Sequence, residues 1–306
     1  MLKPLADPVS LCLAGEISVP TMLARLVMDG ASVATIREML GARPEAASLR
    51  AQVETRIPAL QKLHTMWQHA AVDHASAGGP ASIAAQFDTA VRHAPEAAVA
   101  AYSLGDPDLL AEATGELVAW LQREALLPRG ADVLDLGCGI GRVAAALMPP
   151  ARSVLGVDVS NGMIAEANRR HGDIAGLAFR HTEGDALDFL PTAAFDLVLA
   201  VDSFPYILIA GSAIAARHIA DAARVLRPAG TLAIFNLSYA ADPAADIATV
   251  SNWAAAAGFH PLHRGEQPFS LWDATVVTFR RRMSPRGPQL GESGTSSDEP
   301  ALRRGR

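Results

Sequence analysis

Residues 133–142 read Val-Leu-Asp-Leu-Gly-Cys-Gly-Ile-Gly-Arg, and they constrain the possible folds more than any other stretch of this chain. An apolar run ends in an acidic residue, three glycines alternate with other residues, and a helix-forming run begins at Val143. Glycine accepts positive φ and has no Cβ, so such a turn bends sharply and lets a ligand approach its backbone. The stretch therefore predicts a β-strand, a tight turn and the start of a helix.

The alternation of strand and helix continues after this turn. We expect strands at 131–136, 153–158, 177–181, 195–201 and 231–236, and helices at 141–148, 161–170, 212–226 and 244–257. Repeated β-α units imply a doubly wound, mostly parallel sheet in an α/β fold. Segments 259–264 and 274–282 follow one another without a helix, so a hairpin with an antiparallel last strand is expected. The expected architecture is a seven-stranded Rossmann-like sheet, with a turn at Arg227 to Gly230 before the fifth strand.

Residues 1–93 lack strand alternation and predict a helical N-terminal region. Apolar residues at three- and four-residue steps predict a long helix from about Pro44 to Ala75. Pro58 lies inside that pattern, so the helix should be kinked or broken there. We expect this region to act as a lid over the binding pocket, as a dimer interface of a homodimer, or as both.

The glycine spacing distinguishes two kinds of nucleotide-binding turn. The dinucleotide fingerprint is G-x-G-x-x-G, and its third glycine would fall on Arg142. The pattern D-x-G-x-G-x-G, from Asp135 to Gly141, resembles the class I S-adenosylmethionine (SAM)-dependent methyltransferases, in particular small-molecule enzymes of methyltransferase type 11 or 25. The resemblance covers roughly residues 100–282. It implies SAM as the cofactor and a SAM-binding methyltransferase domain over residues 94–282.

The resemblance also implies cofactor contacts at three successive strand ends. Asp135 would accept a hydrogen bond from the amino group of SAM. The turn that would meet the methionyl carboxylate comprises Gly137, Cys138, Gly139 and Gly141. Asp158 ends the second strand, where an acid can accept both ribose hydroxyls. Asp185 and Ala186 follow the third strand and would contact the adenine through a carboxylate and a backbone amide.

Asp202 and Tyr206 are the candidate catalytic residues. Asp202 ends the fourth strand and would face the reactive methyl group, either as a general base or by orienting the substrate or the SAM amine. Tyr206 is a second candidate and would otherwise form a wall of the pocket. The tripeptide Phe204-Pro205-Tyr206 is similar to the Asn/Asp-Pro-Pro-Tyr signature of amino-group methylation, but one extra residue breaks the match. That specificity is therefore not predicted.

Weaker candidates lie in the later loops and helices. Asn236, Ser238 and Tyr239 follow the fifth strand and could line the acceptor side. His218 lies in the middle of a predicted helix, and we expect it on a solvated helix face. The segment Tyr102 to Gly105 precedes the first helix of the predicted catalytic domain and could form part of a lid.

Composition narrows the possible partners and the cellular setting. The formal net charge of −6 argues against nucleic acid as the main partner, because phosphate binding relies on a basic surface. Cys12 and Cys138 lie far apart, so no disulfide framework and no metal site are expected. No uncharged apolar run reaches the length of a membrane span. We expect a cytoplasmic protein with a small-molecule methyl acceptor, and a disordered tail at 283–306, which is rich in Pro, Gly, Ser and charge.

Two other functions compete with methyl transfer. The first is a non-catalytic SAM-binding or interaction protein, because a nucleotide site alone does not require catalysis. The second is an NAD(P)-dependent oxidoreductase, which the glycine spacing disfavours. A Tyr-x-x-x-Lys pair is also impossible in the α/β part, since the only lysines are Lys3 and Lys62. The sequence does not identify the acceptor or its nucleophilic atom.

Overall fold

The computed structural model describes residues 7–70, 78–240 and 243–283. The predicted disordered tail lies almost wholly outside the described residues, as does the end of the predicted helix that runs to Ala75. Within the described ranges, no helix combines the length and the apolar character that crossing a bilayer requires. The same ranges contain no group of three or more His, Cys, Asp or Glu side chains that could hold a metal ion.

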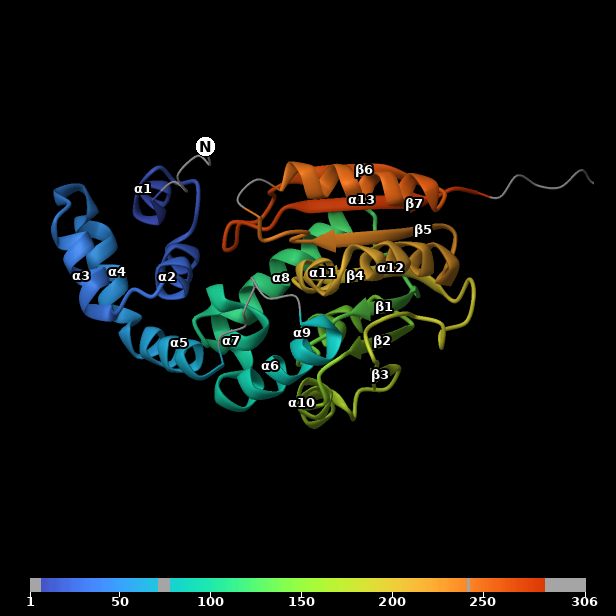
Figure 1. The fold of residues 1–306 in the computed structure, drawn as a ribbon, viewed down its shortest axis with the longest axis horizontal. Helices are drawn as coiled ribbons and strands as arrows, with labels where there is room; N and C mark the ends of the chain where they lie inside the picture. Colours follow the sequence, from blue (N-terminus) through green and yellow to red (C-terminus); the bar gives the residue numbers. More distant parts are fainter. Residues whose placement is uncertain (1–6, 71–77, 241–242, 284–306) are drawn as a thin grey trace, which may run out of the picture.

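A seven-stranded sheet in the order β3-β2-β1-β4-β5-β7-β6 forms the centre of the molecule (Figure 1). Its strands are β1 (Asp132–Leu136), β2 (Ser153–Asp158), β3 (Leu177–His181), β4 (Phe195–Val201), β5 (Leu226–Phe235), β6 (Phe259–Glu266) and β7 (Val276–Arg281). Strands β1 to β5 are parallel, and β7 runs antiparallel to both β5 and β6. The predicted fold class is confirmed. Strand order reverses between β1 and β4, the point at which open α/β sheets bind ligands.

Helices cover both faces of this sheet. They are α8 (Pro107–Arg123), α9 (Arg142–Leu147), α10 (Asn161–His171), α11 (Phe204–Ala210), α12 (Ser212–Val225) and α13 (Ala244–Ala256). Successive residues of a strand point to opposite faces, so Val133 joins the apolar core beneath α8 and α9 while Leu134 joins the core beneath α12 and α13. Both side chains are fully buried. The continuous apolar run of β1 therefore reflects a strand that is covered on two sides.

Two local features differ from the sequence expectation. The predicted turn at Arg227 to Gly230 lies inside β5, which begins at Leu226. The chain bends there without leaving the sheet, because Ala229 adopts φ +64° and the register shifts along β4 between Phe195 and Leu197. In addition, α11 occupies a segment for which no helix was predicted.

The N-terminal third of the chain is helical, as predicted. It comprises α1 (Pro8–Leu13), α2 (Val19–Met28), α3 (Val33–Gly41), η1 (Pro44–Ala46), α4 (Ala47–Thr55), α5 (Ile57–Ala70), α6 (Gly79–His93), α7 (Pro95–Val99) and η2 (Ala101–Ser103). The predicted long helix is broken at Arg56, between α4 and α5. Pro58 falls in the first turn of α5, where its missing N–H costs no helical hydrogen bond.

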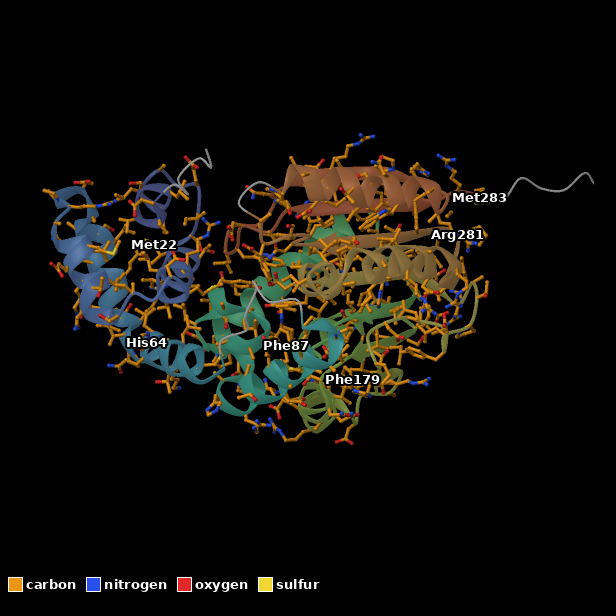
Figure 2. All side chains as sticks on the ribbon, viewed as in Figure 1. Met22, His64, Phe87, Phe179, Arg281 and Met283 are labelled. Atoms are coloured by element: carbon orange, nitrogen blue, oxygen red, sulfur yellow. The ribbon has the colours of Figure 1, made fainter. Side chains whose placement is uncertain are left out.

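Helix α6 belongs to both halves of the molecule. Ala90 packs into the core of the N-terminal helices together with Met22, whereas the next residue, Val91, packs into the core under the sheet. Figure 2 shows Met22 among the N-terminal helices, Phe179 on the sheet, and Phe87 of α6 between them. The N-terminal helices are therefore attached to the sheet through a shared apolar helix.

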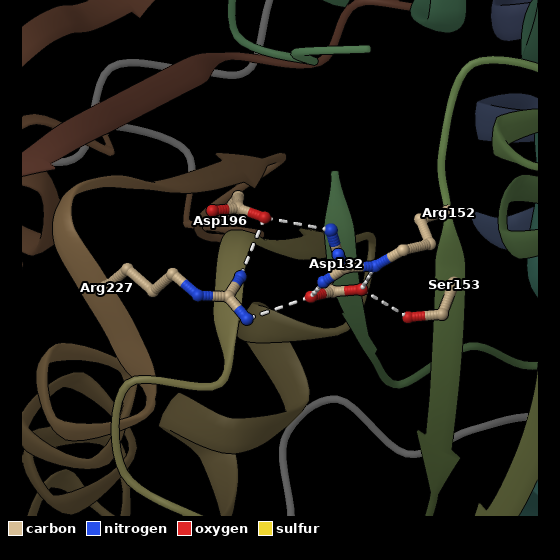
Figure 3. A network of polar contacts seen from close by, with 5 residues as sticks. All are labelled: Asp132, Arg152, Ser153, Asp196 and Arg227. Carbon is tan, nitrogen blue, oxygen red and sulfur yellow. Dashed lines mark hydrogen bonds and ion pairs between the residues drawn. The ribbon is translucent and has the colours of Figure 1, made fainter. Parts of the chain in front are cut away.

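A network of charges lies at the amino edge of the sheet (Figure 3). Asp132, the first residue of β1, accepts hydrogen bonds from Arg152 Nε at 2.9 Å, Ser153 Oγ at 2.7 Å and Arg227 Nη2 at 2.8 Å. Arg227 also donates to Asp196 Oδ2 at 2.8 Å. The hydrogen bonds from Arg152, Ser153 and Arg227 hold the pKa of Asp132 well below its usual range. This edge is fully paired and serves stability.

Candidate functional site

A cavity of about 1500 Å³ lies at the carboxyl ends of the strands, between the sheet and the N-terminal helices. The predicted site residues that line it are Asp135, Gly137, Cys138, Gly139, Asp158, Asp202 and Tyr206. Three others, Gly141, Asp185 and Ala186, are not among its lining residues. The structure thus gathers most of the predicted cofactor residues and both predicted catalytic residues around one space.

The glycine turn that follows β1 is closely packed. A Cβ on Gly139 would lie 2.5 Å from Val99 Cγ1, and Gly139 has φ +53°. A Cβ on Gly141 would lie 2.5 Å from the Phe179 ring, and this glycine has φ +78°. Side chains at these positions would push the covering segment or the sheet away. Gly141 therefore permits packing beneath the turn, whereas Gly139 lies at the cavity itself.

Asp135 is a buried carboxyl group without a full set of partners. It is 1% exposed, and among the described residues its Oδ2 has no hydrogen-bond partner. Burial raises the pKa of Asp135 to about 7, while the positive charge of Arg142 opposes this shift. An unpaired buried carboxyl oxygen is unusual unless a ligand completes it. Its chemistry fits an ammonium group such as the amino group of SAM.

Asp158 closes the glycine turn from the end of β2. Its Oδ2 accepts from the Gly139 amide at 2.9 Å, and its Oδ1 accepts from the Ser160 amide at 2.9 Å. Burial raises the pKa of Asp158, and these backbone hydrogen bonds oppose the shift. A carboxylate has about four lone-pair sites, so two backbone bonds leave capacity for hydroxyl donors. The residue holds the turn in shape and still faces the cavity.

Asp202 and Asn236 form a pair at the ends of two adjacent strands. Asp202 follows β4 with φ +55°, and Asn236 follows β5 with φ +61°. Because Val201 and Phe235 are register partners, the next residues lie side by side, and Asn236 Nδ2 donates to Asp202 Oδ1 at 2.7 Å. Burial raises the pKa of Asp202 to about 6, against the hydrogen bond from Asn236. Left-handed backbone at non-glycine residues costs about 1–3 kcal/mol and often marks functional sites.

Two tyrosines lie beside this pair. Tyr206 is on α11 and packs edge-on against Phe87 of α6, with ring centroids 4.9 Å apart. The hydroxyl of Tyr239 donates to that of Tyr206 at 3.4 Å. Burial raises the pKa of the Tyr206 phenol well above its usual range. The Tyr206 hydroxyl therefore stays neutral and offers a proton for hydrogen bonding rather than acting as a base.

Arg142 is the lining residue whose role the sequence interpretation missed. Its Nη1 donates to Thr114 Oγ1 at 2.8 Å and its Nη2 to Tyr102 Oη at 3.4 Å. Its positive charge opposes the rise in pKa that burial causes at both Asp135 and Asp202. One signal was available in the sequence. A cation in the first turn of a helix opposes the helix dipole, which indicates a role outside the helix.

His218 is not on a solvated helix face, and that expectation is wrong. The side chain is 2% exposed, and its Nδ1 lies 2.9 Å from the Ile214 carbonyl oxygen. The buried stripe of α12 runs through Ala215, Ile219 and Ala222, and the helical period places His218 in it. Burial lowers the pKa of His218, so the imidazole is mainly neutral. His218 is among the residues that line the cavity.

The loop after β3 reaches the cavity through Thr182 and Gly184 rather than through the predicted acid. Asp185 is exposed and Ala186 is buried, and neither is among the lining residues. The segment Tyr102 to Gly105 reaches the cavity through Tyr102. Asn236, Ser238 and Tyr239 all line the cavity, which is where the acceptor side was expected.

Comparisons with known proteins match the central part of this chain. A family model described as a methyltransferase domain matches residues 133–230. A demethylmenaquinone methyltransferase of Tropheryma whipplei is 34% identical over 111 residues, which is 36% of this chain and 43% of that protein. A ribosomal RNA large subunit methyltransferase G of Streptomyces avermitilis is 40% identical over 111 residues, 35% of this chain and 29% of that protein. The chain spans less than half the length of these curated relatives.

A solved structure gives the same fold. Phosphoethanolamine N-methyltransferase 1 of Haemonchus contortus, in complex with phosphoethanolamine and S-adenosylhomocysteine, aligns with a TM-score of 0.52 at 16% identity, over 70% of this chain and 51% of that one. The sheet order and the helices on both faces define an α/β protein of the Rossmann-like kind. The family match is more specific: residues 133–230 match a methyltransferase domain, and the relatives that share 34–40% identity with part of this chain are methyltransferases. The match favours this class over the nicotinamide-dependent alternative.

Proposed function

We propose that this protein transfers a methyl group from SAM to a small-molecule acceptor bound in the same cavity. The observation that carries the proposal is one continuous cavity lined by two differently equipped sets of residues. Asp135, the glycine turn and Asp158 form one set, and Asp202, Tyr206 and Asn236 form the other. The N-terminal helices cover this space, and the chain is acidic overall, which favours a small acceptor over a nucleic acid.

The residues at the glycine turn fit the polar groups of SAM. The unpaired Oδ2 of Asp135 would accept from the amino group, and Gly137 and Gly139, which carry no Cβ, would let the methionyl part of SAM approach the backbone closely. Asp158 would accept the ribose hydroxyls, and Asp185 and Ala186 stay candidates for the adenine. When bound, SAM would supply an electrophilic methyl group. The nucleophilic atom of the acceptor would form a bond to the methyl carbon, and the sulfur would keep the electron pair of the sulfur–methyl bond that breaks.

Asp202 is the proposed proton acceptor of the site. With a pKa of about 6 it is mostly ionised near neutral pH, so it can take the proton that the nucleophile loses. Asn236 occupies its Oδ1 and leaves the other oxygen to face the acceptor. The neutral hydroxyl of Tyr206 would orient the acceptor atom by donating a hydrogen bond. Positioning accounts for most of the rate in such a displacement, and the base assists weak nucleophiles.

Calorimetry with SAM and S-adenosylhomocysteine tests the cofactor half of the proposal. We expect micromolar binding of both, and about 2 kcal/mol weaker binding in Asp158→Ala, because polar partners are left unpaired. Binding of NADH in place of both SAM compounds would overturn the proposal. The acceptor half is tested by incubating labelled SAM with pooled small molecules. SAM binding without transfer to any acceptor would favour the non-catalytic alternative.

A further inference from the structure

The cavity is too large for one ligand. Sites for single small molecules usually measure about 300–1,000 Å³, and this cavity measures about 1500 Å³. The glycine turn, Asp135 and Asp158 account for one end. The opposite end, here called the helical compartment, is lined by residues of the N-terminal helices, and nothing in the methyltransferase motifs explains them.

The helical compartment is mainly apolar. Helices α1, α2 and α5 contribute Pro8, Leu11, Ala24, Met28 and Met66 to its lining. Aromatic rings complete it on the side of the sheet, where Trp272 packs against Tyr102 with ring centroids 5.2 Å apart. Burial of apolar ligand surface against such a wall is favourable at about 25 cal/mol per Å².

The charges at this end are already compensated. The guanidinium of Arg25, on α2, forms an ion pair with Asp273 in the segment between β6 and β7. Asp29, which follows α2, is exposed to solvent and therefore stays hydrated. An anionic ligand that entered the compartment would lose its own hydration without meeting an unpaired cation, and a cationic ligand would meet only the hydrated carboxylate of Asp29, so burial of either charge is costly.

The wall that α2 forms is held in place next to the catalytic end. The carbonyl oxygen of Leu271 accepts from Ser18 Oγ at 2.6 Å and from Thr21 Oγ1 at 2.9 Å. Thr21 and Arg25 lie one helical turn apart on α2, so the hydrogen bonds to Leu271 and the Arg25–Asp273 ion pair attach α2 to the β6–β7 segment at two successive turns. The apolar surface of α2 is therefore part of the site rather than a loosely packed neighbour.

We propose that the N-terminal helices form the acceptor compartment of this protein and select an uncharged, predominantly apolar acceptor. The proposal rests on the proposed methyltransferase function, because it gives the second ligand of the same cavity its chemical class. A chain-like or ring-containing molecule would lie between α2 and Trp272, with its nucleophilic atom toward Asp202. An anionic acceptor would find Arg25 already paired with Asp273, and a cationic acceptor would find Asp29 only as an exposed, hydrated carboxylate.

Calorimetry on the full chain saturated with S-adenosylhomocysteine tests this assignment with defined probes. We would titrate 4-propyl-, 4-pentyl- and 4-heptylphenol, and analogues of each with a terminal carboxylate or ammonium group. Affinity should rise about fourfold per added methylene, the value expected for burial in an apolar site. Each charged analogue should bind at least tenfold more weakly. Equal or tighter binding of a charged analogue, or no dependence on chain length, would overturn the proposal.

Matched variants locate the binding. Met28→Arg places a charge in the compartment and should weaken heptylphenol binding more than tenfold. Leu13→Arg adds the same charge to an exposed position of α1 outside the cavity and should leave it unchanged. Asp273→Asn releases Arg25 and should improve binding of the carboxylated analogue severalfold. All three variants should bind S-adenosylhomocysteine as the parent chain does. If the parent chain itself does not bind S-adenosylhomocysteine, that result contradicts the proposed function rather than the assignment of the helical compartment.

Discussion

Two aspartates of β1, three residues apart, have opposite surroundings. Asp132 at the amino edge accepts from Arg152, Ser153 and Arg227, and these bonds keep its pKa low. Asp135 at the carboxyl edge is more deeply buried, one of its oxygens has no partner among the described residues, and burial raises its pKa to about 7. The same residue type in the same strand therefore stabilises the fold at one end and leaves binding capacity at the other.

The pH dependence of stability separates the two aspartates most strongly. The folded protein holds the proton of Asp135 more tightly than the unfolded chain does. The protonated Asp135 therefore contributes to the free energy of unfolding below about pH 4, and this contribution is lost as the pH rises to about 7. For Asp132 the sign is opposite: its contribution is present above about pH 4 and is lost as the pH falls. In the parent chain, the free energy of unfolding should decline by roughly 3–4 kcal/mol between pH 4 and 7 because of Asp135. Urea unfolding between pH 3 and 8 should show that Asp135→Asn removes this decline.

Asp132→Ala should lower the free energy of unfolding by about 2 kcal/mol at pH 7, because Ser153, Arg152 and Arg227 lose a charged hydrogen-bond acceptor that is itself buried. Urea denaturation provides the measurement. Asp188→Ala is the matched control, since Asp188 pairs with Arg217 at an exposed site, where such pairs contribute at most about 1 kcal/mol. Equal losses in the two variants would refute a special role for the amino-edge network.

Asp135→Asn should leave the fold intact at pH 7 and weaken binding of S-adenosylhomocysteine by about 2 kcal/mol, or roughly 30-fold. The physical reason is the loss of a charged hydrogen bond to the ligand's ammonium group. Binding to the parent chain should also release a proton below pH 7, since the ammonium group stabilises the ionised form of Asp135. Calorimetry in buffers of different ionisation enthalpy measures both effects. Unchanged affinity in a folded variant would remove Asp135 from the cofactor site.

The smallest effect is expected at Asn236. Its hydrogen bond favours the ionised form of Asp202, so Asn236→Ala should move the acidic limb of the pH–kcat/KM profile upward by about one pH unit, equivalent to about 1 kcal/mol. Asn168→Ala, at an exposed position of α10, is the control and should leave the profile where it is. An unshifted profile in the Asn236 variant would argue against Asp202 as the base.

Local patterns were sufficient to predict the sheet. The bounds of β2, β3 and β4 agree with the predicted ranges, because each is a short apolar run between turn residues. The glycine turn and Asp158 were placed correctly for the same reason. Helix α11 was not predicted, since its apolar residues have no polar face that would produce a helical period.

Contacts that join distant parts of the chain could not be predicted. The sequence interpretation used Arg142 only because it stands where the dinucleotide fingerprint has a glycine. Its hydrogen-bond partners, Thr114 and Tyr102, are 28 and 40 residues away in the sequence, so local patterns do not indicate them. The burial of His218 depends on how α12 packs on the sheet. The helical compartment likewise exists only because α2 contacts the β6–β7 segment, and no local spacing records that contact.

The bonds from α2 to Leu271 have a consequence for how the protein assembles. Thr21 and Leu271 are separated by 250 residues, among the longest loops that any contact of this molecule closes. During synthesis, α2 emerges early and its partner segment emerges only after the whole parallel part of the sheet, so this wall is completed late. The buried apolar residues of α2 pack on other N-terminal helices that are made early, so only its contact with the β6–β7 segment must wait. Folding should therefore end with the docking of an early helix onto a late loop.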